Sequence, residues 1–274
     1  MFFNGQLGNI QLLYACFIAF VAFSLAGSSI YCFNDIWDVE ADRKHAKKCR
    51  RPIASGAIAT TEGYVIQMVC LAASILILSL WGGESKYVLA GLILFYYGMN
   101  MAYCLILKRY PIVDVMVISI GFVLRVLAGG FATGIYLSEW IILMTFLLAL
   151  FLAFAKRRDD VVLYQNTGIQ PRKNTHRYNL DFINQVMTVV SAITIMAYIM
   201  YTVSPDVTQR FNSQYVYLTS VFVLAGIIRY LQVTIVDLKS GDPTKILMCD
   251  RFIQLCIIGW ILSFFIIIYI VNER

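Results

Sequence analysis

The sequence has few charged residues, no paired-cysteine motif and no nucleotide-binding motif. Each of these absences excludes a class of protein. Only 14% of the 274 residues are charged while 60% are hydrophobic, and the apolar residues form runs too long for a soluble core. The seven cysteines form no CxxC pair and no zinc spacing, so we expect neither a disulfide framework nor a zinc site. No Rossmann fingerprint or other nucleotide-binding motif is present. The composition therefore indicates a polytopic membrane protein.

Eight apolar segments are long enough to cross a membrane as helices of roughly 20 residues. They comprise residues 9–33, 62–82, 86–107, 112–134, 138–156, 182–203, 214–236 and 251–271. We therefore predict an all-α transmembrane bundle that forms one integral-membrane domain over residues 1–274.

The segments between the predicted spans alternate between strongly basic and nearly uncharged. Lys and Arg gather at 42–51, 108–109, 156–177 and 239–251. The positive-inside rule places these segments on the cytoplasmic side of the membrane, and the amino terminus outside. We predict that cytoplasmic loops 42–61, 157–181 and 237–250 cap an active site on that face.

The stretch from Asn34 to Gly56, NDIWDVEADRKHAKKCRRPIASG, follows the first span and is unusually charged. Asp35, Asp38 and Asp42 fall at i, i+3 and i+7, which on a helix places three carboxylates on one face. Crowded carboxylates repel one another unless a cation neutralises them, and hard oxygen ligands suit Mg²⁺ held together with substrate phosphates. The plain alternative is a charged loop that only orients the protein, but acidic residues contribute little to topology. The spacing favours a phosphate and metal site, with Asn34 as a further oxygen ligand.

The pattern NDxxDxxxDR followed by HxxKxxRPIASG resembles the UbiA superfamily of intramembrane prenyltransferases. Within it, the chain is most similar to the decaprenyl-phosphate phosphoribosyltransferases. The resemblance continues in YCLILKRYPIVD from Tyr103, GFVLRVLAGG from Gly121, FLAFAKRRDD from Phe151, RYLQ from Arg229 and GDPTKILMCDR from Gly241. It covers nearly the whole chain.

The resemblance implies a fold of nine transmembrane helices with a cytoplasmic amino terminus. Since the predicted topology has eight helices and an amino terminus outside, we expect the first helix of the family to be missing from this sequence.

The resemblance also implies Mg²⁺-dependent transfer of 5-phosphoribosyl from phosphoribosyl diphosphate to a polyprenyl phosphate, with release of pyrophosphate. Expected partners are these two substrates and the bilayer, with no nucleic acid. Asp35, Asp38 and Asp42 would hold Mg²⁺ on the diphosphate. A phosphate monoester is already ionised near neutral pH, so no strong general base is required.

Further residues are candidates for binding the substrate phosphates. Lys108 with Tyr103 resembles the YxxxK element of the superfamily, although the spacing here is one residue longer. KRRDD stands where the superfamily has its second aspartate motif, which suits two anionic substrates; the alternative is a basic helix end that snorkels to the interface. The remaining members of the predicted substrate site are Arg43, Lys44, His45, Lys47, Arg51, Lys156, Arg157, Arg158 and Asp159.

Two charged positions inside the fourth span have open interpretations. Arg125 lies near its middle, where a charge is expensive, and faces either a headgroup cavity or a buried partner. Asp114 lies near its start, where it binds metal or ribose hydroxyls or merely favours the helix amino terminus.

Two rival functions remain at this stage. A UbiA-type aromatic prenyltransferase would need a second set of spaced aspartates at the fifth span, and KRRDD argues against it. A transporter of anionic substrates would be expected to show inverted repeats and broken helices at the midplane, and the sequence displays no such symmetry.

Overall fold

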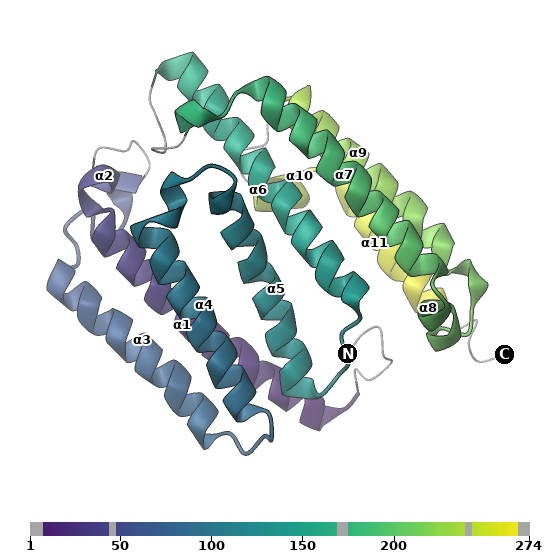
Figure 1. Cartoon of the computed structure of the whole chain (residues 1–274), viewed down its shortest axis with the longest axis horizontal. Helices are drawn as coiled ribbons and strands as arrows, with labels where there is room; N and C mark the ends of the chain where they lie inside the picture. The colour runs from purple at the N-terminus through teal and green to yellow at the C-terminus, as the bar shows by residue number, and fades with distance from the viewer. Residues whose placement is uncertain (1–7, 44–47, 169–174, 239–242, 268–274) are drawn as a thin grey trace. The chain divides into compact units, whose positions relative to one another are not determined.

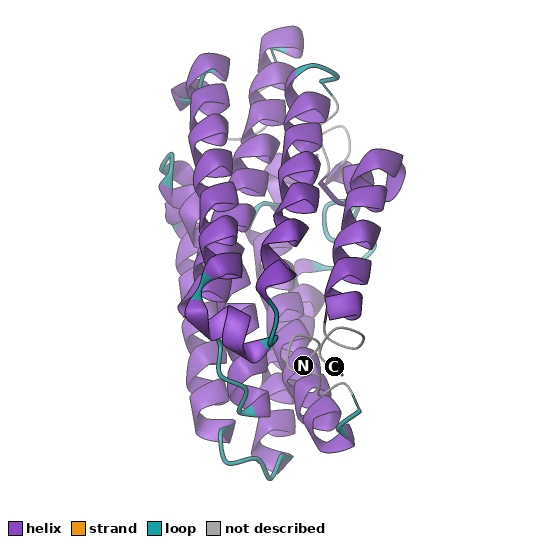
Figure 2. Ribbon diagram, turned by 90° about the vertical axis from the view of Figure 1, so that its right-hand side faces the viewer, coloured by secondary structure: helices purple, strands orange, loops and turns teal. Residues whose placement is uncertain are grey.

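The computed structural model describes residues 8–43, 48–168, 175–238 and 243–267, and helices and turns without any strand make up these residues (Figure 2). Seven helices among them are long and apolar enough to cross a membrane. An eighth span is present if α10 and α11, bent by 82° at their junction, count as one. The all-α prediction is confirmed.

The chain divides into two compact units, residues 1–137 and 138–274, which are described separately. The first contains α1 (Ile10–Trp37), α2 (Val39–Arg43), α3 (Thr60–Leu80), α4 (Lys86–Leu105) and α5 (Val113–Thr133), with short 3-10 turns η2 (Lys48–Arg50) and η3 (Leu107–Arg109) (Figure 1). The second contains α6 (Glu139–Thr167), η4 (Thr175–Arg177), α7 (Leu180–Val203), α8 (Pro205–Arg210), η5 (Gln214–Thr219), α9 (Ser220–Ile235), α10 (Pro243–Cys249) and α11 (Arg251–Ile266).

Each predicted span coincides with a helix, but two helices run further than predicted. α1 continues to Trp37 and thus carries Asp35. α6 continues to Thr167 instead of ending at 156, so the predicted loop 157–181 begins as helix. Charge marks where an apolar span ends, but charged residues do not stop a helix; α6 stops at Gly168, whose φ of +69° is the left-handed conformation that ends many helices.

In the first unit, α1 is the central helix and presents small residues to its neighbours. Ala19, Ala22 and Ala26 are buried in the core that α1 forms with α3, α4 and α5. Small side chains let membrane helices approach closely, and polar side chains can then bond across them. Two such bonds join α1 to α3: the Ser74 hydroxyl donates to the Ala22 carbonyl at 2.7 Å, and the Ser29 hydroxyl to the Gln67 carbonyl at 2.8 Å.

The chain after α2 is fastened to the end of α1 by a close contact at a glycine. Gly63, in the first turns of α3, lies against the buried side chains of Ile36 and Ile53, and a Cβ added there would come within 2.9 Å of Ile53 Cδ1. This packing holds the RPIASG segment beside the last turn of α1, the region that carries the aspartates.

The second unit packs its helices as neighbours in the order α6, α7, α9 and α11. A buried hydrogen-bond network joins three of its elements: the Tyr198 hydroxyl shares a 2.7 Å bond with Thr219 and accepts a 2.6 Å bond from the Trp260 indole. At the opposite end, Asp250 starts α11 by accepting from the Ile253 amide and binds Arg229 of α9 at 2.8 Å. The short helix α10 begins at Pro243 and precedes α11.

Candidate active site

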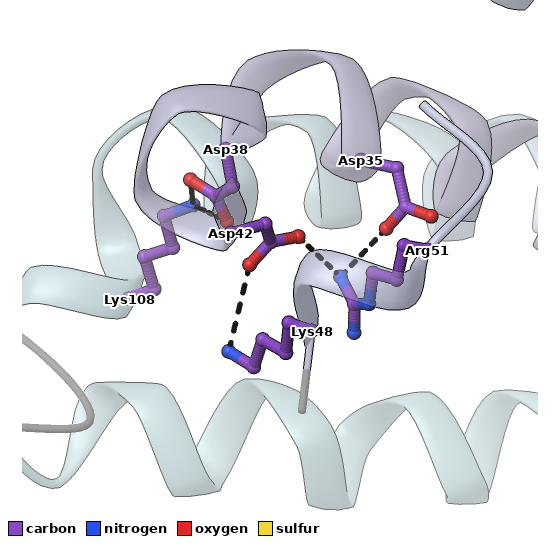
Figure 3. Close-up of polar contacts among 6 residues, drawn as sticks. All are labelled: Asp35, Asp38, Asp42, Lys48, Arg51 and Lys108. Carbon is purple, nitrogen blue, oxygen red and sulfur yellow. Dashed lines mark hydrogen bonds and ion pairs between the residues drawn. The ribbon is translucent and has the colours of Figure 1, made fainter. Parts of the chain in front are cut away.

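The aspartates of the charged stretch lie where α1 ends and α2 begins (Figure 3). α1 stops at Trp37, the chain turns at Asp38, and α2 starts at Val39, with the Asp42 amide bonded to the Asp38 carbonyl at 2.8 Å. The prediction that the three carboxylates share one helix face required a continuous helix through Asp42. The break leaves the three carboxylates in one region, where Arg51 binds Asp35 and Asp42 and Lys108 binds Asp38.

Arg51 joins the first and third aspartates. Its Nη1 donates to Asp35 Oδ1 at 2.7 Å and to Asp42 Oδ2 at 2.9 Å. The other Asp42 oxygen lies 3.9 Å from Lys48 Nζ. Asp42 is only 3% exposed, and burying a charged group is costly unless it is paired. The basic residues that follow the aspartates in sequence therefore fold back to neutralise them.

Lys108 holds the second aspartate from a distant part of the chain. Its ammonium donates to both carboxylate oxygens of Asp38, at 2.6 and 2.7 Å. Lys108 belongs to η3, which connects α4 to α5, so packing of α4 and α5 against α1 brings it to the aspartates. Figure 3 shows it approaching from the side opposite Arg51.

The donor set fits a divalent cation that is completed by substrate. In the described part of the chain, no three acidic, histidine or cysteine side chains lie close enough to ligate one metal ion by themselves. Mg²⁺ does not require such a cluster, because it is typically held by one or two carboxylates, several waters and substrate phosphates. Asp35, Asp38 and Asp42 offer hard oxygens, and Arg51, Lys108 and Lys48 lie beside them as cations in the arrangement seen here.

Other predicted residues of the first unit lie around this cluster without joining it. Asn34 is half-buried on α1, while exposed Arg43 donates to the Ala54 carbonyl at 3.3 Å and braces the RPIASG segment. Tyr103 packs against the hydrophobic core. Asp114 is completely buried in the first turn of α5, which favours helix stabilisation over contact with substrate. Lys44, His45 and Lys47 lie outside the described residues.

Arg125 faces a cavity, which is one of the two surroundings that the sequence left open for it. Its guanidinium donates to the Tyr96 hydroxyl at 2.8 Å and lines a cavity between α1 and α5. No carboxylate pairs with it within the described residues of the first unit, so the buried ion pair that the sequence left open is not formed there.

The KRRDD residues of the second unit are divided between the surface and the interior. Lys156 is exposed, and Asp159 is half-buried. Arg157 is almost completely buried and lies 3.2 Å from Asp160, one turn along the same helix.

Arg158 holds three helices together. It is 4% exposed, with Nε donating to Asn184 Oδ1 at 2.9 Å and Nη1 to the Thr234 carbonyl at 2.6 Å. The Thr234 carbonyl belongs to the last turn of α9, where carbonyls lack partners within the helix. Arg158 therefore ties α6 to α7 and α9 in this arrangement, and its binding of a substrate phosphate stays a prediction.

Replacing Arg158 with methionine is expected to destabilise the protein by about 2 to 4 kcal/mol, because Asn184 and the α9 carbonyl lose a buried charged donor. This corresponds to a fall in Tm of roughly 5 to 10 °C in detergent. The exposed neighbour Lys156→Met is the control and should change Tm little. Equal Tm values for the two variants would contradict the structural assignment of Arg158.

The residues that sequence reasoning missed are the partners of those it found. Lys48 beside Asp42, Tyr96 beside Arg125 and Asn184 beside Arg158 come from other turns or helices. Lys48 carries a signal, because it lies in the same basic run as Arg51. Tyr96 and Asn184 carry none, since a tyrosine or asparagine in an apolar helix matches no motif.

The chain is similar to known proteins along most of its length. The profile of the UbiA prenyltransferase family matches residues 2–255. The decaprenyl-phosphate phosphoribosyltransferase of Corynebacterium glutamicum is 31% identical, over 92% of this chain and 75% of its own length. That of Mycolicibacterium smegmatis is 33% identical, over 89% and 77%. Among solved structures, a UbiA homolog from Archaeoglobus fulgidus bound to DMAPP and Mg²⁺ superposes with a TM-score of 0.64 at 17% identity, over 93% of this chain and 88% of that one.

Proposed function

This chain is an integral membrane protein that belongs to the UbiA prenyltransferase family, and on that basis we propose that it is a polyprenyl-phosphate phosphoribosyltransferase. The proposed reaction transfers 5-phosphoribosyl from phosphoribosyl diphosphate to a polyprenyl phosphate of the decaprenyl type and releases pyrophosphate. The identity of about one third to two bacterial enzymes of this activity, along nearly the whole chain, supports the choice of reaction. The observation that carries the mechanism is the cluster in which Arg51 binds Asp35 and Asp42 while Lys108 binds Asp38.

The proposed reaction depends on stabilising negative charge on phosphate groups more than on proton transfer. A phosphate oxygen of the lipid forms a bond to C1 of the ribose, and the bond from C1 to the diphosphate oxygen breaks, so that the electron pair leaves with pyrophosphate. The attacking phosphate is largely ionised at neutral pH, and no protein base has to remove a proton from it. The protein must therefore bring two anions together and stabilise a third as it departs.

The cluster contains the groups for this task. Asp35, Asp38 and Asp42 would hold a divalent cation together with the substrate diphosphate, with fewer than three of them on any one ion in the arrangement seen here. When bound, that cation supplies the positive charge that stabilises departing pyrophosphate. Arg51 and Lys108 keep the carboxylates in position and present N–H donors, which form strong charge-assisted bonds to phosphate oxygens. We place this site at the cytoplasmic face of a bacterial inner membrane, because the basic segments follow the positive-inside pattern.

The alternative of an aromatic prenyltransferase has less support. It would need a second pair of spaced aspartates on α6, to hold a second cation on a prenyl diphosphate. Asp159 and Asp160 are adjacent, so they project in directions about 100° apart on the helix, and Asp160 lies beside Arg157. These residues do not repeat the spacing of the first motif.

The reaction can be tested directly with protein purified in detergent. Incubation with Mg²⁺, phosphoribosyl diphosphate labelled in the ribose, and polyprenyl phosphate is expected to give labelled lipid, whereas omission of the lipid gives none. A parallel tube contains a prenyl diphosphate and hydroxybenzoate. Prenylated hydroxybenzoate without labelled phospholipid would overturn the proposed reaction within the same family.

A further inference from the structure

The guanidinium of Arg125 is held by aromatic groups from three helices. Its central carbon lies 5.7 Å from the ring centre of Phe23 on α1, 5.3 Å from Tyr96 on α4 and 5.1 Å from Phe122 on α5. The Tyr96 hydroxyl accepts one of its hydrogen bonds at 2.8 Å. Ring faces stabilise a cation without neutralising it. The group is therefore fixed in place while its positive charge remains available.

A charge at this depth needs an explanation. Arg125 lies near the middle of α5, an apolar helix long enough to cross a membrane. Arginines at such positions normally face a bundle interior or a water-filled cavity and pair with an anion. The described residues of the first unit provide no carboxylate partner, and the side chain is exposed to a cavity. An anion from outside the protein would complete the site.

The cavity beside Arg125 has the shape and lining for a lipid headgroup. It has a volume of about 450 Å³ and lies between α1 and α5. Ser24, Ser28 and Tyr31, which carry hydroxyl groups, are among the residues that line it. Apart from Arg125, the rest of its lining is small or apolar. A mixed lining of this kind suits a phosphate attached to a hydrocarbon chain better than it suits a free, fully hydrated phosphate.

The cavity leads toward the aspartate cluster along one face of α1. Tyr31, which lines the cavity, precedes Asp35 by four residues and so lies on the same helix face, one turn away. Phe23 marks the level of the guanidinium, about 18 Å from Asp35 along the helix axis. This interval has to hold the metal, the diphosphate and the ribose before the acceptor phosphate is reached.

We propose that Arg125, oriented by Tyr96, binds the phosphate of the polyprenyl phosphate acceptor in the cavity between α1 and α5. The identity of the lipid rests on the proposed function, whereas the recognition of a lipid phosphate rests on the cavity and its cation. Asp35, Asp38 and Asp42 then serve the donor substrate at one end, and Arg125 serves the acceptor at the other.

Direct binding of lipid, measured without phosphoribosyl diphosphate, tests this assignment. Native mass spectrometry would compare a short polyprenyl phosphate with the matching polyprenol on the wild type, Arg125→Met and Arg125→Lys. We expect Arg125→Met to weaken binding of the phosphate by about tenfold to a hundredfold and to leave binding of the alcohol unchanged. Arg125→Lys should restore part of the preference. Equal loss for phosphate and alcohol would overturn the proposal, and so would competition by inorganic phosphate as strong as by the lipid.

A second pair of variants leaves Arg125 in place. A Cβ added at Gly129 meets no atom within 4 Å, so Gly129→Leu fills the cavity without a clash at Cβ. Gly91→Leu is the matched control, because Gly91 on α4 is equally open and lies outside the cavity lining. Only Gly129→Leu is expected to weaken lipid binding. Equal affinity in both variants would remove the cavity from the acceptor site.

Kinetics separate this inference from the proposed function. If the wild type transfers phosphoribosyl groups, Arg125→Met should raise KM for the lipid and leave KM for phosphoribosyl diphosphate unchanged. A change confined to the donor KM would overturn the Arg125 assignment alone. If the wild type transfers nothing but still binds the lipid phosphate through Arg125, the proposed reaction fails and the binding site stands.

Discussion

Replacing Asp38 with asparagine is expected to lower kcat for phosphoribosyl transfer by about two to three orders of magnitude. The substitution keeps the size of the side chain and removes its charge, so the site loses both an oxygen anion for the divalent cation and the partner of Lys108. A Mg²⁺ titration at saturating substrates should also show a higher metal requirement. Initial rates with labelled phosphoribosyl diphosphate measure both effects.

Glu40→Gln is the matched control for Asp38→Asn. Glu40 lies two residues away in α2 and is exposed, so its amide variant removes the same charge from the same segment outside the cluster. Activity near the wild-type level is expected for Glu40→Gln. An Asp38→Asn protein as active as this control would end the assignment of the aspartates to the active site.

Removal of divalent cations is expected to reduce transfer by at least about a hundredfold and to leave the fold nearly unchanged. The first effect follows because departing pyrophosphate would lose its main source of positive charge. The second follows because Arg51, Lys108 and Lys48 already pair with the three aspartates in the arrangement seen here. Chelator treatment followed by activity and Tm measurements compares the two quantities on one sample.

The combination of results distinguishes a catalytic cation from a structural one. Activity that returns on adding Mg²⁺, with a small change in Tm throughout, supports the catalytic role. A large fall in Tm on chelation would identify a structural metal, and undiminished transfer would show that Arg51 and Lys108 alone can stabilise the leaving group.

The positions of the spans were predictable, because a membrane helix must satisfy its backbone internally and cover itself with apolar side chains. Each of the eight apolar runs therefore overlaps a helix in the described part of the chain. The ends were less predictable, as α6 shows: the charges of KRRDD end the apolar run, but the backbone continues as a helix to Thr167. Hydropathy reports the boundary of the membrane, whereas the end of a helix depends on capping.

In the candidate site too, some features of the aspartates were predictable from the sequence and others were not. Their spacing and the basic run that follows were enough to expect carboxylates gathered near a helix end with cations close by. The break at Asp38 and the choice of Arg51 and Lys108 as partners depended on how η2 and η3 approach α1. A motif specifies which groups are present, and only packing specifies which of them touch.

The arginines mark the limit of what sequence alone determines for this protein. Composition and motif spacing determined the membrane class, the all-α fold, the family resemblance and the position of the aspartate cluster, because these follow from local patterns of polarity. The tertiary structure decided that Arg158 binds the end of α9 and that Arg125 faces a cavity. Both are arginines within or at the end of an apolar helix, and their surroundings come from helices distant in sequence. A long charged side chain takes its role from the groups that surround its tip, and those groups are assembled only when the helices pack.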